Sequence, residues 1–94
     1  MTAINRYIGK EIGGFTIIAI LSLDINTRVI CCNDVDTEDG SKHLEAEHWL
    51  DENTFHFNSL YYDHDGNFIE SERVEMPNKD IREFERVFCA LDQE

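Results

Sequence analysis

The stretch TFHFNSLYYDHDGNFIESERVE, residues 54–75, decides the fold of this chain. Its first part, residues 54–62, is rich in aromatic and other residues that favour strands. The tetrapeptide Asp63-His64-Asp65-Gly66 follows, and its Asp-Gly pair is a strong signal for a tight hairpin turn. We therefore predict two antiparallel strands, over 54–62 and 67–75, joined by that turn.

A second hairpin is predicted upstream. The run FTIIAILSL, residues 15–23, is rich in β-branched residues and is typical of a central strand. Residues 24–27 supply turn-forming side chains, and residues 28–32 return as the next strand. We expect the odd-numbered residues of 15–23 to share one face. Ile18 and Ile20 should lie on the other face, partly covered by the C-terminal helix.

The segment between the two hairpins is ambiguous. Residues 33–41 read as a loop or as the frayed tip of another hairpin. Residues 42–50 contain good helix formers with Ser41 as a cap, but their apolar and polar side chains alternate as in a strand. Because short turns flank this segment, we favour a strand and a meander-like sheet.

The C-terminal segment is predicted to form an amphipathic helix. Pro77 ends the sheet, Asn78 can cap the helix, and Asp80 suits the positive end of its dipole. The apolar stripe consists of Ile81, Phe84, Val87, Phe88 and Leu91. We expect it to cross the sheet face that carries Ile17, Leu21 and Phe57 or their alternates. A short helix over residues 2–8 is also expected.

These elements predict one α+β domain over residues 1–94. Its antiparallel sheet has four to five strands in a meander-like order, and the C-terminal amphipathic helix packs on one face. With 41% hydrophobic residues the chain is too apolar for a disordered acidic tail.

The charge is strongly asymmetric. The chain has 20 acidic and 8 basic residues, a formal net charge of −12, and residues 29–72 hold twelve acids against the single base Lys42. Such a surface repels phosphate backbones, so we expect no direct binding to nucleic acid. No stretch approaches the ~20 apolar residues of a membrane span, so no membrane partner is expected.

The N-terminal residues and the cysteines indicate a compartment. Residues 1–14 lack the basic start and apolar stretch of a signal peptide. Cys31 and Cys32 are adjacent, which makes a bridge between them strained, and Cys89 is the third cysteine. Reduced thiols in a cytoplasmic protein are the simplest interpretation.

Motifs for chemistry are weak. Asp63, Asp65, Gly66 and Glu72 match part of a calcium loop, but Tyr61 stands at its first position and the flanks look like strands, so a hairpin turn explains them. The four histidines have no zinc spacing, although His48 and His56 could approach each other on adjacent strands. We therefore expect no metal, no cofactor and no enzymatic activity.

The sequence favours a non-enzymatic acidic binding protein. It would act as an inhibitor or regulator that presents carboxylates to a basic partner, such as a nuclease or another nucleic-acid-binding protein. Phage and mobile-element proteins that block nucleases share this general composition. Trp49 is either an aromatic anchor or a residue packed at the sheet edge. The predicted partner-binding residues are Asp34, Asp36, Glu38, Asp39, Glu45, Glu47, Trp49, Asp51 and Glu52.

A second hypothesis from another class remains open. The chain would be a structural or accessory subunit that self-associates as a homodimer through an apolar sheet edge or helix. Its charge would then serve only solubility.

Overall fold

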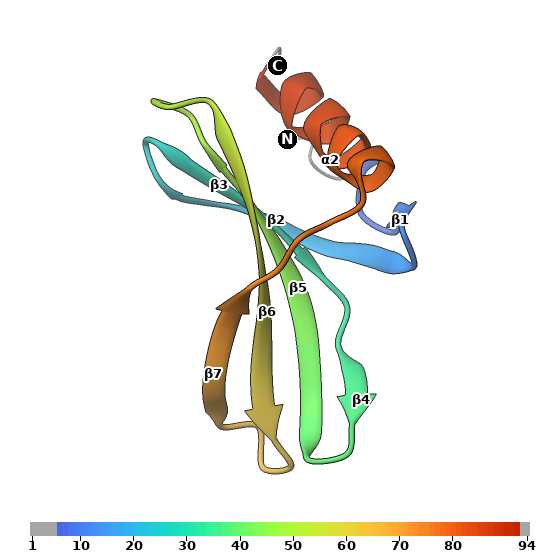
Figure 1. The fold of residues 1–94 in the computed structure, drawn as a ribbon. Helices are drawn as coiled ribbons and strands as arrows, with labels where there is room; N and C mark the ends of the chain where they lie inside the picture. Colours follow the sequence, from blue (N-terminus) through green and yellow to red (C-terminus); the bar gives the residue numbers. More distant parts are fainter. Residues whose placement is uncertain (1–5, 93–94) are drawn as a thin grey trace.

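The computed structural model describes residues 6–92 and shows an antiparallel sheet with one helix packed against part of it (Figure 1). Within those residues the elements are β1 (Glu11–Ile12), β2 (Phe15–Asp24), β3 (Thr27–Cys32), β4 (Val35–Thr37), β5 (Gly40–Trp49), β6 (Thr54–Asp63), β7 (Phe68–Arg73) and α2 (Asn78–Asp92). The strand order is β1-β2-β3-β5-β6-β7, and β4 lies beside the start of β5.

The predicted fold class is confirmed, but the sheet in the described residues has seven strands instead of four or five. The additional strands, β1 and β4, have two and three residues, too few to show a periodic pattern. The ambiguous segment 42–50 belongs to a strand, β5, as favoured. The predicted helix over 2–8 lies mostly outside the described residues. In the part of the chain that is described, no helix combines the length and apolar character needed to cross a bilayer.

The long hairpin of β5 and β6 is the spine of the sheet. All ten residues of β5 pair with β6, from Gly40 opposite Asp63 to Trp49 opposite Thr54. The other edge of β5 is shared, because β4 pairs with residues 40–42 and β3 pairs with residues 45–49. This division gives the sheet two halves. The helix lies over the half that contains β1, β2 and β3, and the other half projects away from it (Figure 1).

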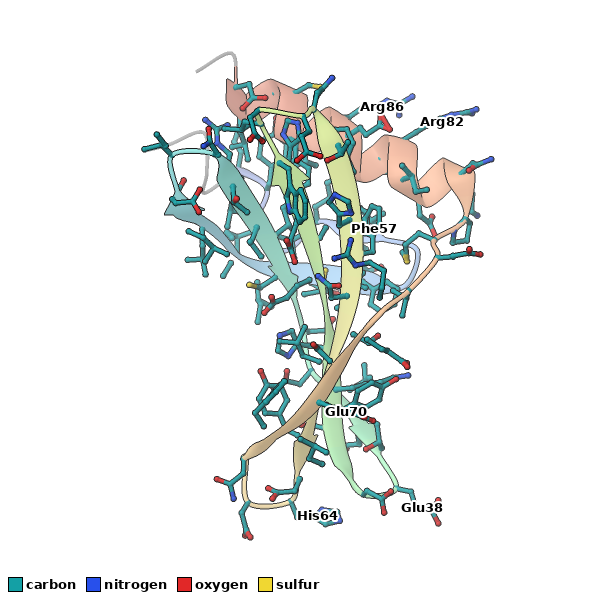
Figure 2. The ribbon with its side chains drawn as sticks, turned by 60° about the vertical axis from the view of Figure 1, so that its left-hand side comes forward. Glu38, Phe57, His64, Glu70, Arg82 and Arg86 are labelled. Carbon is teal, nitrogen blue, oxygen red and sulfur yellow. The ribbon has the colours of Figure 1, made fainter. Side chains whose placement is uncertain are left out.

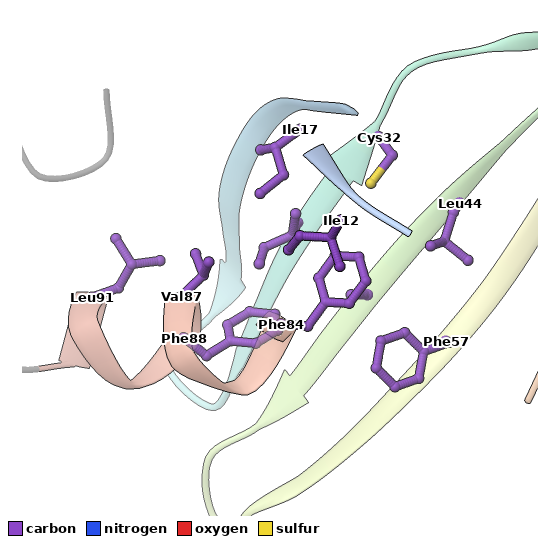
Figure 3. Close-up of a cluster of buried hydrophobic side chains, with 11 residues drawn as sticks. Ile12, Ile17, Cys32, Leu44, Phe57, Phe84, Val87, Phe88 and Leu91 are labelled. Atoms are coloured by element: carbon purple, nitrogen blue, oxygen red, sulfur yellow. The ribbon is translucent and has the colours of Figure 1, made fainter. Parts of the chain in front are cut away.

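The core lies between α2 and the half of the sheet beneath it (Figure 3). Four of the five predicted stripe residues are buried, and Ile81 is partly buried. Phe84 meets Phe57 of β6 with ring centroids 5.4 Å apart, a tilted arrangement that suits aromatic rings. The stripe and the alternating strand residues therefore supply a shared core. Its buried members are Ile12, Ile17, Ile30, Cys32, Leu44, Ala46, Phe57, Phe84, Val87, Phe88 and Leu91.

The expected face alternation of β2 is wrong beyond Ile17. A register shift between Ile17 and Ala19 inserts one extra residue, which moves the following side chains to the opposite faces. Ile20 then pairs with buried Ile30 and packs against the core, whereas Leu21 is 49% exposed. Leu21 therefore does not lie under the helix.

The first turn of α2 packs closely against the turn between β1 and β2. Asp80 is buried although it carries a charged group, and it lies against Gly13 in the turn between β1 and β2. Gly13 has φ of 58°, and a Cβ at this position would stand 2.4 Å from Oδ2 of Asp80. Only glycine both adopts this φ readily and leaves room for the carboxylate of Asp80, so glycine here lets the turn and the helix pack together.

Candidate binding surface

The projecting half of the sheet is dominated by carboxylates, and we call it the acidic ribbon. It comprises residues 34–42 and 61–72, which belong to β4, the start of β5, the end of β6 and β7. Glu38, His64 and Glu70 mark this end in Figure 2, remote from Arg82 and Arg86 on α2. The ribbon has one lysine, Lys42, and eight carboxylates: Asp34, Asp36, Glu38, Asp39, Asp63, Asp65, Glu70 and Glu72.

Strand pairing brings the two acidic segments together. Gly40 lies opposite Asp63, so the turn before β5 and the turn after β6 stand side by side. The approach is close, because a Cβ on Gly40 would stand 2.0 Å from the carbonyl oxygen of Tyr62, and the φ of Gly40 is 156°. Glycine at this position therefore allows the two acidic turns to form one tip.

The turn after β6 is built on Asp63. Its Oδ1 accepts the backbone N–H groups of Asp65 and Asn67, each at 2.9 Å. The hydrogen bond from Asn67 is the main cause that lowers the pKa of Asp63, because it stabilises the charged carboxylate. Glu72 on β7 accepts the hydroxyl of Tyr61 at 2.7 Å, and this bond raises the pKa of that hydroxyl. The residues that resembled part of a calcium loop thus organise a hairpin.

Most ribbon carboxylates are open to solvent. Asp36, Glu38 and Asp39 are exposed on β4 and its turn, as is Asp65 in the turn after β6. Every residue of β7 is also exposed, which includes Glu70. These groups are accessible to an incoming cation, and mutual repulsion is reduced by water and salt.

Glu45, Glu47 and Trp49 lie elsewhere, on the sheet face opposite α2. They alternate with buried Leu44, Ala46 and His48 along β5 and are themselves half-buried. Glu47 accepts the indole N–H of Trp49 at 2.8 Å and the side-chain amide of Asn58. Trp49 also packs against the ring of His56 at 4.1 Å. The carboxylate of Glu47 therefore already accepts hydrogen bonds within the sheet, and the half-buried carboxylates of Glu45 and Glu47 are less available to a partner than those of the ribbon.

The two groups meet at His43, at the base of the ribbon. Its Nε2 lies 2.9 Å from Oε2 of Glu45, and its Nδ1 lies 3.2 Å from Oδ1 of Asp34 without hydrogen-bond geometry. The ring stacks on Tyr62 at 5.4 Å. Burial, with a smaller effect of Glu45 and Asp34, raises the pKa of Tyr62. His43 is thus bracketed by two carboxylates on a face that α2 leaves uncovered.

The remaining predicted residues, Asp51 and Glu52, lie at the other end of the sheet. They form the turn between β5 and β6, and β5 separates them from the ribbon tip by about 30 Å for a ten-residue strand. The nine predicted residues therefore do not form one surface. Four lie in the ribbon, three lie on the face of β5 that is turned away from α2, and two lie in the turn between β5 and β6. The residues predicted to bind a partner did not include Asp63, Asp65, Glu70 and Glu72, although the Asp-Gly hairpin signal could have placed these four close to one another.

The histidine pair considered from the sequence does not form. His48 lies opposite Phe55 on the buried face, whereas His56 lies opposite Glu47 on the other face. His48 is 3% exposed, its ring stacks on Phe55 at 4.4 Å, and its Nε2 lies 3.0 Å from Oδ1 of Asn53. In residues 6–92 no group of three or more His, Cys, Asp or Glu side chains could hold a metal ion.

The cysteines are free thiols in different environments. Burial is the main cause that raises the pKa of Cys31 to about 11 and that of Cys32 to about 12. Both are thus protonated at neutral pH, the opposite of what an activated nucleophile requires. Cys89, in contrast, is exposed on α2.

The chain matches no known protein family, no curated protein and no solved structure. Its function is therefore inferred from its own charges, contacts and exposed surfaces.

Proposed function

We propose that this chain is a non-enzymatic acidic binding protein that presents the acidic ribbon to a basic protein partner and inhibits or regulates it. The observation that carries the proposal is the gathering of eight carboxylates around one lysine on a projection outside the core. A nuclease or another nucleic-acid-binding protein is the class of partner that fits best, because its binding groove already recognises a dense array of negative charges.

The physical basis of binding is electrostatic complementarity. Residues that share a face of a strand, such as Glu70 and Glu72, repeat at about 6.7 Å, which gives a regular row of charges. A strongly negative projection attracts a basic groove over several ångströms, speeds association and repels acidic proteins. Bound carboxylates would occupy the groove and exclude nucleic acid by competition.

The position of the ribbon supports this role. The buried core lies under α2, whereas the exposed carboxylates of the ribbon project beyond it. Stability and recognition therefore depend on different parts of the sheet, and charges on the ribbon can change with little effect on the core. On the face opposite α2, Glu45 lies nearest to the ribbon, and Glu47 and Trp49 follow it along β5 towards the far end of the strand, so these residues would extend the contact along β5.

A pull-down from host lysate at low salt, eluted along a salt gradient and read by mass spectrometry, tests the proposal. Two variants with the same change in net charge accompany the parent protein. The ribbon variant combines Asp36→Asn, Glu38→Gln, Asp39→Asn and Glu70→Gln. The control variant combines Glu11→Gln, Asp24→Asn, Glu75→Gln and Glu85→Gln.

We expect the parent and the control variant to retain the same basic protein until moderate salt, and the ribbon variant to lose it. Equal retention by the ribbon variant would show that the ribbon is not the recognition surface. If the parent captures no salt-sensitive basic protein, the proposal is wrong, and the charge serves only solubility.

A further inference from the structure

The outer edge of β2 is open and apolar. β1 pairs only with Phe15 and Thr16, and Gly9 and Lys10 bond the backbone of Ile17. Among the described residues no strand pairs with the outer edge from Ile18 to Asp24. Along this edge Ile18 is 53%, Leu21 49% and Leu23 64% exposed. An edge of this kind is a template for another strand.

The backbone groups that face outward follow from the register. Just outside β3, the carbonyl of Asn26 accepts the N–H of Leu50, and the N–H of Asn33 donates to the carbonyl of Thr16. By alternation, the backbone groups of even-numbered residues in β3 point towards β5 and those of odd-numbered residues point towards β2. Because Ile20 and Ser22 lie opposite the even residues Ile30 and Arg28, their own N–H and C=O groups point away from β3. Within residues 6–92 these four groups have no backbone partner.

The distribution of charge on the molecule favours an approach of a second copy of the chain at this edge. β2 has no charged residue from Phe15 to Leu23, on a molecule whose net charge is −12. The opposite edge strand, β7, carries Glu70 and Glu72 and has a register shift, the features that protect an edge from pairing. A second copy of this chain is therefore repelled from most of the surface but not from β2.

We propose that two copies of the chain pair through β2, antiparallel across a two-fold axis at Leu21. The free segment 18–24 is centred on Leu21, so this register pairs Ile20 with the partner's Ser22 and the partner's Ile20 with Ser22. Four backbone hydrogen bonds then close the edge. The two Leu21 side chains meet on one face, where Ala19 lies next to the partner's Leu23.

This register also keeps the two Asp24 residues apart, and it places each of them opposite Ile18, close to Lys10 of the other copy. Asp24 of one copy and Asp24 of the other lie six residues apart along the paired strands, about 20 Å, which exceeds the screening length at physiological salt. The acidic ribbons belong to strands further from the shared edge and stay exposed. The dimer thus leaves both ribbons free, and its existence does not depend on the function proposed for them.

The dimer is tested by sedimentation velocity and light scattering from about 10 µM to 1 mM protein. The contact is small, so a dissociation constant in the micromolar range is expected. The mass should rise from 11.0 kDa towards twice that value with concentration. Added salt should strengthen self-association because it screens repulsion, whereas salt weakens binding to a basic partner; the two proposals therefore fail separately.

Leu21→Lys is the test variant because it places two ammonium groups against each other on the two-fold axis. Ile69→Lys on β7 is the matched control, since Ile69 is 52% exposed on the other edge. We expect Leu21→Lys to weaken the dimer at least tenfold and Ile69→Lys to leave it unchanged.

Amide hydrogen exchange gives a readout that does not depend on a variant. Exchange at Ile20 and Ser22 in the parent should slow as concentration rises. A mass of 11.0 kDa at 1 mM together with concentration-independent exchange would overturn the proposal. A dimer that Ile69→Lys disrupts and Leu21→Lys does not would overturn it as well.

Discussion

Stability should depend on the half of the sheet under α2 and hardly at all on the acidic ribbon, and two phenylalanines test this. Phe84 is 0% exposed in the core, whereas Phe68 on β7 is 57% exposed. Replacing a fully buried Phe by Ala removes its burial and leaves a cavity, which costs about 3–5 kcal/mol. Phe68→Ala removes little buried area and one edge contact with Tyr62, so it should cost about 1 kcal/mol.

Urea unfolding followed by circular dichroism measures both variants against the parent. A domain of this length has about 5–14 kcal/mol of stability in total, so Phe84→Ala should remove about a fifth of it or more. Its midpoint of thermal unfolding should fall by about 15–30 °C. Equal losses in the two variants, or a loss below about 1.5 kcal/mol for Phe84→Ala, would refute the assignment of the core to the interface with α2.

Three further predictions follow from particular contacts. Gly40→Ala should cost at least about 2 kcal/mol in urea unfolding, because its Cβ would collide with the backbone of Tyr62; a smaller loss would mean that the hairpins are less close. A brief iodoacetamide treatment of folded protein at pH 8, followed by mass spectrometry, should modify exposed Cys89 before half-buried Cys31 and buried Cys32, and labelling of Cys32 as fast as that of Cys89 would contradict the burial of Cys32. Unfolded cysteines titrate near pH 9 but Cys31 and Cys32 titrate near 11 and 12 when folded, so the unfolded chain binds fewer protons in between. The free energy of unfolding should therefore fall as pH rises from about 9 to 12, and Cys31→Ser should make that fall shallower.

Much of the fold could be predicted from local sequence patterns. The stripe from Ile81 to Leu91 predicted the helix and its buried face, and turn residues located the hairpins around residues 24–27 and 63–66. These signals work because helix periodicity and turn chemistry are properties of short segments. The register shift after Ile17 is different, since one inserted residue reverses the face of Leu21 and leaves no mark in composition.

The candidate binding surface could be predicted only in part, because it too depends on how the strands pair. The sequence located the acidic excess in residues 29–72, but whether two acids share a surface depends on strand pairing. Gly40 opposite Asp63 joins Glu38 to Asp65 at one tip, although they are far apart along the chain. One of the two hydrogen bonds to the carboxylate of Glu47 comes from Asn58 in the neighbouring strand, which no local pattern reveals.

The acidic ribbon is proposed to recognise a basic protein, and this is the claim on which the proposed function depends. The most direct test is a titration of ¹⁵N-labelled protein with the basic partner eluted from the salt gradient, followed by amide chemical shifts. The largest shifts should fall in residues 34–42 and 61–72, with smaller ones at Glu45 and Glu47, and 0.5 M salt should reverse them. Shifts concentrated on α2 or on the outer edge of β2, with the ribbon unchanged, would contradict the claim.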